Sequence, residues 1–316
     1  MAKYGFILSM IFFSFHLSGQ NNKIYYDSLW NETDSANHQY YRMVTGYSKI
    51  MEAYLVNDHY KGGKIQMEGW YSDQFFTKKT GKFKYYYENG NLAHIENYVN
   101  DSIAGEYKTW YENGDKEFEC VFLKREATFD PDGSGIIINY WDENAEQLVI
   151  KGHGRMVFHR ENGSFFQGNI RKGVKDSIWT GYYQPFNLTY TEFYKDGMLI
   201  DGESTDSLGV KHKYNKIKVS PEPVDGFNGL KKYISKNVVY PAIARQSNIQ
   251  GLVIVEFNVN QEGKITDVDV PGKADKYLKQ EALSVIKSYK KRFTIPYYRG
   301  FPCIMSMKQP VSFKLN

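Results

Sequence analysis

The residues of this chain that could do chemistry are its histidines, its cysteines and a few glycine-rich or acidic turns. None of the histidines shows a metal spacing such as H-E-x-x-H, and neither cysteine has a plausible base beside it in the sequence. These residues are His16, His38, His59, His94, His153, His159, His212, Cys120 and Cys303. The sequence therefore predicts no metal site, no cofactor and no catalytic residue, so the protein is expected not to be an enzyme.

Three short segments could bind phosphate or calcium, but their context favours plain turns. Gly133-Ser134-Gly135 and Gly152-His153-Gly154 lack the strand-to-helix setting that a phosphate-binding loop requires. Asp130-Pro131-Asp132-Gly133 has two carboxylates without the further ligands of a calcium loop. The irregular spacing here and around Trp141 predicts an insertion or a capping unit.

Two identical tetrapeptides indicate an internal repeat. Tyr87-Glu88-Asn89-Gly90 recurs 24 residues later as Tyr111-Glu112-Asn113-Gly114, and Tyr60 to Ile65 forms a third copy 27 residues before the first of these. Asn-Gly is a strong hairpin signal, because both residues tolerate positive φ. We therefore expect one hairpin in each repeat.

The repeat extends in both directions. Asp101-Ser102-Ile103 recurs as Asp176-Ser177-Ile178, and degenerate turns follow at Glu161-Asn162-Gly163 and Lys195-Asp196-Gly197. Units of this length cannot bury a face alone and must stack, so residues 40–210 are predicted to form one elongated antiparallel sheet of hairpins. Gly81 to Cys120 resembles the MORN-type repeats of bacterial exported proteins, which implies a scaffold or binding surface with no shared reaction.

The first residues read as an export signal. Lys3 supplies a short positive region, Phe6 to Phe15 is almost entirely apolar, and Leu17-Ser18-Gly19 offers small residues for cleavage after Gly19. We expect a signal peptide at 1–19, an amino-terminal segment at 20–39 and a location in the periplasm or cell envelope. The alternative is that the segment is retained as an inner-membrane anchor.

Charge divides the chain into two parts. Residues 211–316 carry 19 Lys/Arg and 8 Asp/Glu, a balance of +11, and residues 1–210 carry 21 and 28, a balance of −7. The basic part could attract acidic peptides or anionic polymers, or it could be a solvated face whose lysines oppose a helix dipole. The aromatic residues, 16% of the chain, fit strands covered by large rings.

Aromatic rings interleaved with lysine in Lys82 to Tyr87 could stack nucleic acid bases. Export argues against this, so no nucleic acid partner is expected. Weak peptidoglycan or glycan contact through the same rings is the alternative.

The carboxy-terminal part reads as a separate module. Residues 211–226, which contain Ser220-Pro221-Glu222-Pro223, are predicted to be an extended linker. Residues 227–316 then predict helix, short helix, strand, strand, helix and last strand, with alternating Val253, Val255 and Phe257 and a helical stripe that begins at Leu278. The predicted fold is mainly β, an elongated antiparallel sheet of repeated hairpins followed by a small α+β domain.

This carboxy-terminal order resembles the carboxy-terminal domain of TonB energy transducers. The residues that carry the resemblance are Tyr240, Pro241, Ala244, Arg245, Gly251, Val253, Val255, Phe257, Val259, Gly263, Ile265, Val268, Pro296, Gly300, Pro302, Pro310, Val311, Phe313 and Leu315. The resemblance implies an edge strand that accepts a segment of an outer-membrane transporter by main-chain pairing. By position the partner-binding residues are Lys308, Gln309, Val311, Ser312 and Phe313.

Two departures from the family pattern limit what the resemblance implies. The amino-terminal segment looks cleavable, and the spacer is only Ser220 to Gly226. Three hypotheses stay open: an envelope adaptor that captures a strand of a TonB-dependent transporter or another envelope protein in support of transmembrane transport; a MORN-repeat scaffold or binding protein that pairs its edge in a homodimer; and an anchored transducer.

Overall fold

The computed structural model describes residues 23–126 and 135–315, with side chains from 23–123 and 135–315. The predicted signal peptide at 1–19 and the acidic turn at 130–133 lie outside these residues. Within the described ranges, no helix has the length and apolar character needed to cross a bilayer.

The chain divides into two compact units, 1–147 and 148–316. From β3 to β10 of the first unit, each strand pairs antiparallel with the next, and β1 pairs with β2 and β3. The strands are β1 (Ile24–Tyr26), β2 (Glu32–Thr33), β3 (Tyr40–Ser48), β4 (Ala53–Tyr60), β5 (Ile65–Tyr71), β6 (Lys79–Tyr86), β7 (Leu92–Val99), β8 (Ser102–Trp110), β9 (Lys116–Glu126) and β10 (Ile136–Trp141).

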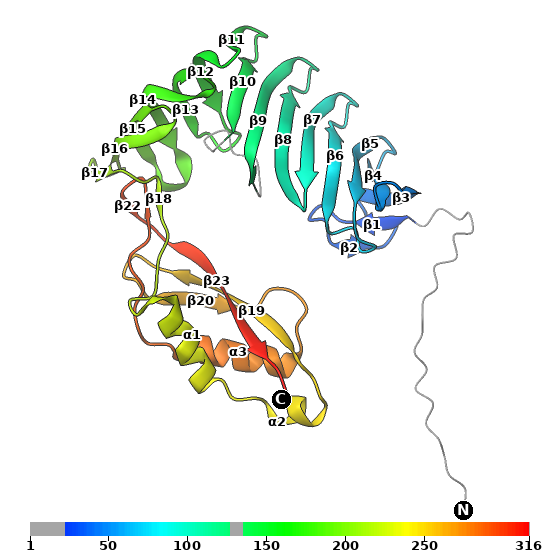
Figure 1. The fold of residues 1–316 in the computed structure, drawn as a ribbon, viewed down its shortest axis with the longest axis vertical. Coiled ribbons are helices and arrows are strands. Elements are labelled where there is room, and N and C mark those ends of the chain that lie inside the picture. The colour runs from blue at the N-terminus through cyan, green and yellow to red at the C-terminus, as the bar shows by residue number, and fades with distance from the viewer. Residues whose placement is uncertain (1–22, 127–134, 316) are drawn as a thin grey trace, which may run out of the picture. The chain divides into compact units, whose positions relative to one another are not determined.

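The second unit contains a further series of antiparallel strands, paired in sequence order from β11 to β17. They are β11 (Gln147–Ile150), β12 (His153–His159), β13 (Phe165–Arg171), β14 (Val174–Tyr183), β15 (Leu188–Lys195), β16 (Met198–Thr205) and β17 (Lys211–Tyr214), with the 3-10 turn η1 (Gln184–Phe186) before β15. The prediction of a mainly β fold, an antiparallel sheet of hairpins followed by a small α+β domain, is confirmed, and the sheet has 17 strands (Figure 1).

The Asn-Gly hairpins have positive φ at only one of the two residues. The Tyr87 amide donates to the Asn91 carbonyl at 2.9 Å and the Gly90 amide to the Tyr87 carbonyl at 2.8 Å, which is a three-residue loop. In this loop Gly90 has a φ of 99°, while Asn89 has no positive φ. Although both residues tolerate positive φ, the loop needs a left-handed residue only at its third position, which Gly90 occupies.

Turns with two residues at positive φ lie between other strands. Asp196 and Gly197 have φ of 48° and 81° between the paired residues Lys195 and Met198. Asn100-Asp101 and Lys172-Gly173 repeat this geometry. These turns match the right-handed twist of the strands they connect.

Tyrosine hydroxyls tie successive hairpins of the first unit together. Tyr60, Tyr87 and Tyr111 each open a turn, and their hydroxyls donate to the carbonyls of Tyr86, Trp110 and Trp141 at 2.7, 2.8 and 2.9 Å. Each of these carbonyls lies directly before the turn of the next hairpin. The tyrosine of the repeated tetrapeptide is thus explained by the stacking of one hairpin on the next.

The core of the sheet is built from aromatic rings that cover glycines of the neighbouring strand. Gly168 pairs with Trp179, Gly181 with Tyr190 and Gly202 with Tyr214. A methyl group at any of these glycines would overlap the opposing ring. Large rings therefore lie flat on the sheet, and those of Trp179 and Tyr190 are shielded from water.

The carboxy-terminal domain has two layers. Its elements are α1 (Gly226–Asn237), α2 (Ala242–Gln246), β19 (Gly251–Val259), β20 (Ile265–Asp269), α3 (Lys276–Ser288) and β23 (Met305–Phe313), with the short strands β18 (Lys218–Val219), β21 (Tyr297–Tyr298) and β22 (Phe301–Pro302). Val253, Val255 and Phe257 of β19 share one buried core with Leu278 and Ile286 of α3. The alternating apolar residues of β19 and the apolar stripe of α3 thus pack in one core.

The segment predicted as an extended linker takes part in regular structure. Its first residues form β17, and Lys218 and Val219 pair with Tyr298 and Tyr297. The Val224 amide donates to the Arg292 carbonyl at 3.0 Å. Residues 211–226 are therefore tied to both neighbours, while the domain boundaries themselves stay a prediction.

Candidate partner-binding strand edge

β23 is an edge strand of the carboxy-terminal domain. The sheet order is β20-β19-β23, and within the described residues β23 pairs only with β19, in register from Gly251 opposite Phe313 to Val259 opposite Met305. Figure 1 shows β23, in red, alongside β19. Nine residues of β23 thus present a second side that has no strand partner within the described chain.

Two observations establish which main-chain groups face the open side. Pro310 has no N–H, so it is accommodated where no bond to β19 is required. Beyond the strand, the Leu315 amide donates at 2.9 Å to the Oε1 of Gln250, the residue before β19. Since main-chain groups alternate in direction along a strand, odd residues face β19 and even residues face outward.

The open side is therefore a discontinuous row of donors. The amides of Ser306, Lys308 and Ser312 point outward, and Pro310 interrupts the row. The Pro310 carbonyl accepts a hydrogen bond at 2.9 Å from the side-chain amide of Gln309. At its centre the edge thus offers no donor and an acceptor that is already engaged, a feature that discourages unspecific pairing.

Side chains of β23 follow the same alternation. Gln309, Val311 and Phe313 are buried, at 7%, 1% and 2% exposure, and the side chains of Lys308 and Ser312 are exposed. Of the five predicted partner-binding residues, Lys308 and Ser312 thus direct their main-chain groups to the open side and their side chains to the exposed face of the sheet. Val311 and Phe313 anchor the strand in the core instead.

Sequence reasoning missed Ser306 and the contact between Gln309 and Pro310. The outward position of Ser306 follows from the two-residue alternation with Lys308, a signal that the sequence contains. The Gln309 contact has no such signal, because the rotamer of one side chain decides it.

The exposed face beside this edge is partly apolar. Leu252 of β19 lies opposite Ser312 and is 61% exposed, and Ile254 lies opposite Pro310. The Lys308 ammonium contacts the Glu256 carboxylate at 2.6 Å. Since this ion pair is largely exposed, it contributes little to stability.

The opposite edge of the sheet is a poorer template. β20 has five residues, its register with β19 shifts between Glu256 and Asn258, and Asp267 has a φ of 50°. A short, bulged and acidic edge resists the addition of another strand. β23 is therefore the edge that fits strand capture.

No group of three or more His, Cys, Asp or Glu gathers as a metal site in residues 23–126 and 135–315. Cys120 and Cys303 are unpaired by disulfide and buried. Burial raises the pKa of the Cys120 thiol to about 12 and raises that of Cys303 as well. A buried thiol with a raised pKa forms little thiolate, so both cysteines are expected to be poor nucleophiles.

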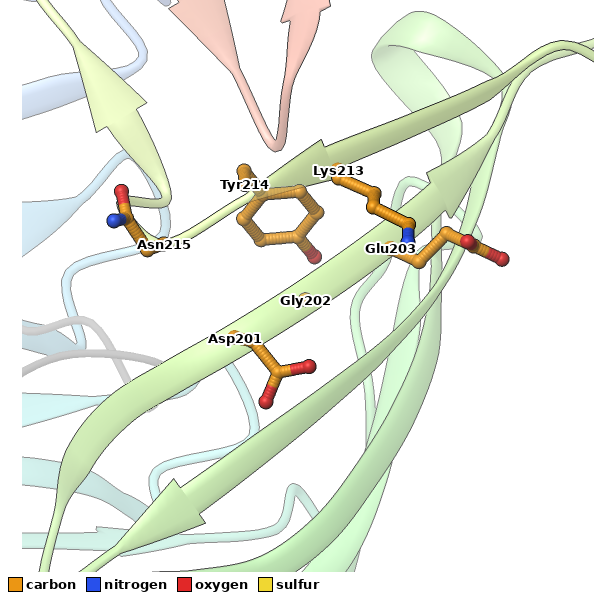
Figure 2. Close-up of a pocket in the computed structure, with 6 residues that line it drawn as sticks. All are labelled: Asp201, Gly202, Glu203, Lys213, Tyr214 and Asn215. Atoms are coloured by element: carbon orange, nitrogen blue, oxygen red, sulfur yellow. The ribbon is translucent and has the colours of Figure 1, made fainter.

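The sheet of the second unit carries a shallow open depression of about 500 Å³. Figure 2 shows the Tyr214 ring over Gly202, with Asp201, Glu203, Lys213 and Asn215 around it. The Lys211 ammonium contacts the Glu203 carboxylate at 2.7 Å beside the depression. The depression is polar and open, unlike the enclosed apolar pockets that bind small cofactors.

The carboxy-terminal domain thus packs helices against a three-stranded antiparallel sheet in which β23 is an edge strand. Residues 236–315 match the family described as the Gram-negative bacterial TonB protein C-terminal, so the chain contains a TonB C-terminal domain there. This family is non-enzymatic, belongs to the Gram-negative cell envelope and implies TonB-dependent transporters in general as partners. The MORN identity of the hairpin sheet stays a prediction.

A similar solved structure is the NMR solution structure of the Helicobacter pylori TonB C-terminal domain, residues 179–285. It is 28% identical, covers 28% of this chain and 78% of its own, and gives a TM-score of 0.22. No curated protein matches this chain.

Proposed function

We propose that this chain is an exported envelope protein whose TonB C-terminal domain captures a segment of an outer-membrane transporter by strand addition to β23, in support of energy-dependent transport. The observation that carries the proposal is the open side of β23, where Ser306, Lys308 and Ser312 present main-chain donors. Main-chain pairing makes little demand on side chains, which suits a domain that serves several transporters.

Charge supports the same partner class. Residues 211–316 have a balance of +11, so an acidic segment is attracted before it docks. The apolar face at Leu252 and Ile254 can cover alternate side chains of an added strand.

The test compares Ser312→Pro with Lys308→Ala in the full chain. Ser312→Pro removes one outward donor and leaves the pairing with β19 intact, so it should abolish binding of transporter-derived peptides. Lys308→Ala keeps the main-chain donor and should bind nearly as well as the unsubstituted protein. Circular dichroism establishes that both variants fold, and equal binding by all three proteins would refute strand capture at this edge.

Self-pairing of β23 in a homodimer is the competing use of this edge. It would appear as dimerisation that Ser312→Pro removes, with no binding of transporter peptides. Sedimentation over a range of protein concentrations separates the two uses.

A scaffold or glycan-binding role is the second candidate, and the surface of β13 to β17 favours it. A second depression adjoins the first and shares Glu203 with it. Phe165, Thr180, Thr189 and Thr191 line it, a ring and hydroxyls of the kind that contact sugars. The protein should then sediment together with purified peptidoglycan, and the Phe165→Ala variant should not. If Phe165→Ala still sediments with peptidoglycan, the glycan-binding role at this depression is refuted.

A further inference from the structure

The hairpin formed by β21 and β22 carries an arginine whose charge is fully buried. Arg299 lies at the tip with a φ of 51°, followed by Gly300 with a φ of 75°. The Arg299 side chain is 1% exposed, and its Nε donates at 2.8 Å to Oε1 of Glu192, whose side chain is 0% exposed. Glu192 belongs to β15 of the hairpin sheet, so this ion pair joins the carboxy-terminal domain to the sheet within the second unit.

The sheet provides a shaped receptor for this tip. The Arg299 guanidinium lies 3.8 Å from the centre of the Tyr190 ring. The Tyr214 hydroxyl donates to Glu192 at 2.8 Å, and the Ser204 hydroxyl donates to the Arg299 carbonyl at 2.6 Å. The sheet thus contacts the Arg299 guanidinium through Glu192 and the Tyr190 ring, and the Arg299 carbonyl through Ser204. Such a combination of contacts is typical of a specific interface.

Aromatic contacts surround the ion pair. The rings of Tyr183 and Tyr298 have centroids 4.4 Å apart, and those of Phe186 and Phe301 lie 5.9 Å apart. A methyl group at Gly300 would press against His212 and the Lys213 carbonyl of β17. The hairpin tip therefore requires glycine at position 300. The surrounding rings shield the buried charges of Arg299 and Glu192 from water.

Part of this arrangement recurs in the first unit, where no arginine of the described residues forms an ion pair with the glutamate. Four residues recur 96 positions apart in the sequence: Lys79, Phe83, Glu96 and Tyr98 correspond to Lys175, Trp179, Glu192 and Tyr194. In both units the tyrosine hydroxyl donates to the glutamate, at 2.6 Å to Glu96 and at 3.0 Å to Glu192. The Glu96 carboxylate lies 3.7 Å from Nε2 of His94.

Tyr190 stands where the first unit has His94, again 96 positions apart. This replacement puts a ring under the guanidinium in place of a second basic group. The repeat glutamate is thus a general feature of the sheet, and its second copy is adapted to receive Arg299.

We propose that the β21–β22 hairpin is a docking plug that locks the strand-capturing domain rigidly onto the last strands of the hairpin sheet. Two buried opposite charges are tolerated only when they stay together, so loss of one leaves the other stranded and favours undocking. The lock takes the place of a flexible spacer, and load applied to β23 passes into the sheet.

The experiment measures rotational tumbling in the full chain by ¹⁵N relaxation. In the unsubstituted protein, residues 251–313 should tumble with the same correlation time as residues 165–205. In Arg299→Met and in Glu192→Gln, the correlation time of residues 251–313 should fall by about twofold, as expected for a small domain on a tether. Arg292→Met is the matched control, because the Arg292 side chain is exposed and donates to the Glu262 carbonyl at 3.3 Å within the carboxy-terminal domain, and it should change nothing.

A shorter correlation time for residues 251–313 in the unsubstituted protein would overturn the lock, whatever the variants do. Unchanged tumbling in both Arg299→Met and Glu192→Gln would overturn the role of the ion pair. Peptide binding at β23 is read separately, so failure of strand capture leaves this result standing, and the reverse holds as well.

Discussion

The turn between β6 and β7 depends on the backbone conformation of Gly90. Its φ of 99° is a conformation that a β-branched residue adopts only with strain. No atom lies within 4 Å of a methyl group built there, so backbone conformation alone opposes substitution. Gly209 has the same role at φ 79°, although no Asn precedes it and the sequence pattern does not mark it.

Gly90→Val is therefore expected to lower the free energy of unfolding by about 1 to 3 kcal/mol. Gly62→Val is the matched control, because Gly62 lies in an equivalent loop with open space around it and no positive φ. Urea denaturation measures both variants. Equal losses would mean that the turn conformation at Gly90 is not what the substitution disturbs.

His94 is expected to make the stability of the first unit depend on pH. Its ring stacks on Tyr85 with centroids 4.1 Å apart, and Nε2 lies 3.7 Å from Glu96. Burial lowers the pKa of His94 below 6.5; Glu96 opposes this shift and Lys79 adds to it. The folded state therefore prefers the neutral ring.

Because the unfolded chain binds the proton more readily, stability should fall as pH drops below about 6.5 toward the lowered folded pKa. His94→Gln should reduce this loss, and His153→Gln, at an exposed position of β12, should leave it unchanged. Thermal unfolding between pH 7.5 and pH 5, roughly the range in which histidine titrates, measures the effect. A pH dependence that survives in His94→Gln would assign it to another group.

At the scale of elements, alternation was sufficient to predict β19 and β23, because one face of each strand is buried. Pro310 also indicated which main-chain groups of β23 face away from β19, since a proline in a paired strand must turn its nitrogen away from the partner. The side-chain bond from Gln309 to Pro310 was beyond prediction. It joins neighbours in sequence, but only the packed rotamer brings the amide to the carbonyl.

Gln309→Leu should tighten partner capture at β23. The substitution keeps a side chain of similar volume in a buried position, replaces its amide by an apolar group and releases the Pro310 carbonyl for a partner strand. A neutral hydrogen bond is worth about 1 kcal/mol, so affinity for an added peptide should rise about fivefold. Titration of a labelled peptide measures this change.

Gln250→Leu is the control for this prediction, because Gln250 binds the Leu315 amide on the β19 side of the strand. It should leave affinity at the open side unchanged. If both variants raise affinity equally, loosening of the whole domain rather than release of Pro310 is responsible.

At the scale of the whole molecule, sequence predicted the modules better than their connection. The repeat signal and the alternating core are short-range patterns, and the structure confirms the fold they define. Glu192 and Arg299 lie 107 positions apart and form no motif, so their pairing was invisible before the fold was known. The contacts of residues 211–226 had no sequence signal for the same reason, since Arg292 and Tyr298, which pair with Val224 and Lys218, are distant in sequence.

A sheet built from stacked hairpins should lose stability locally, because each strand is supported mainly by its neighbours. Phe83 is fully buried over Gly69, and Trp179 is fully buried over Gly168. Each substitution to alanine should cost about 3 to 5 kcal/mol. Hydrogen exchange followed along the chain then distinguishes local from global loss.

Phe83→Ala should speed exchange in β5 to β7 and leave residues 251–313 protected. Trp179→Ala should speed exchange in β13 to β15 and also expose the β21–β22 hairpin, because the receptor for Arg299 is built on β15. The pair is matched, since both rings occupy the same position in the repeat. If Phe83→Ala instead raised exchange uniformly as far as β23, the chain would unfold as one cooperative body and the stacked-hairpin account of its stability would be wrong.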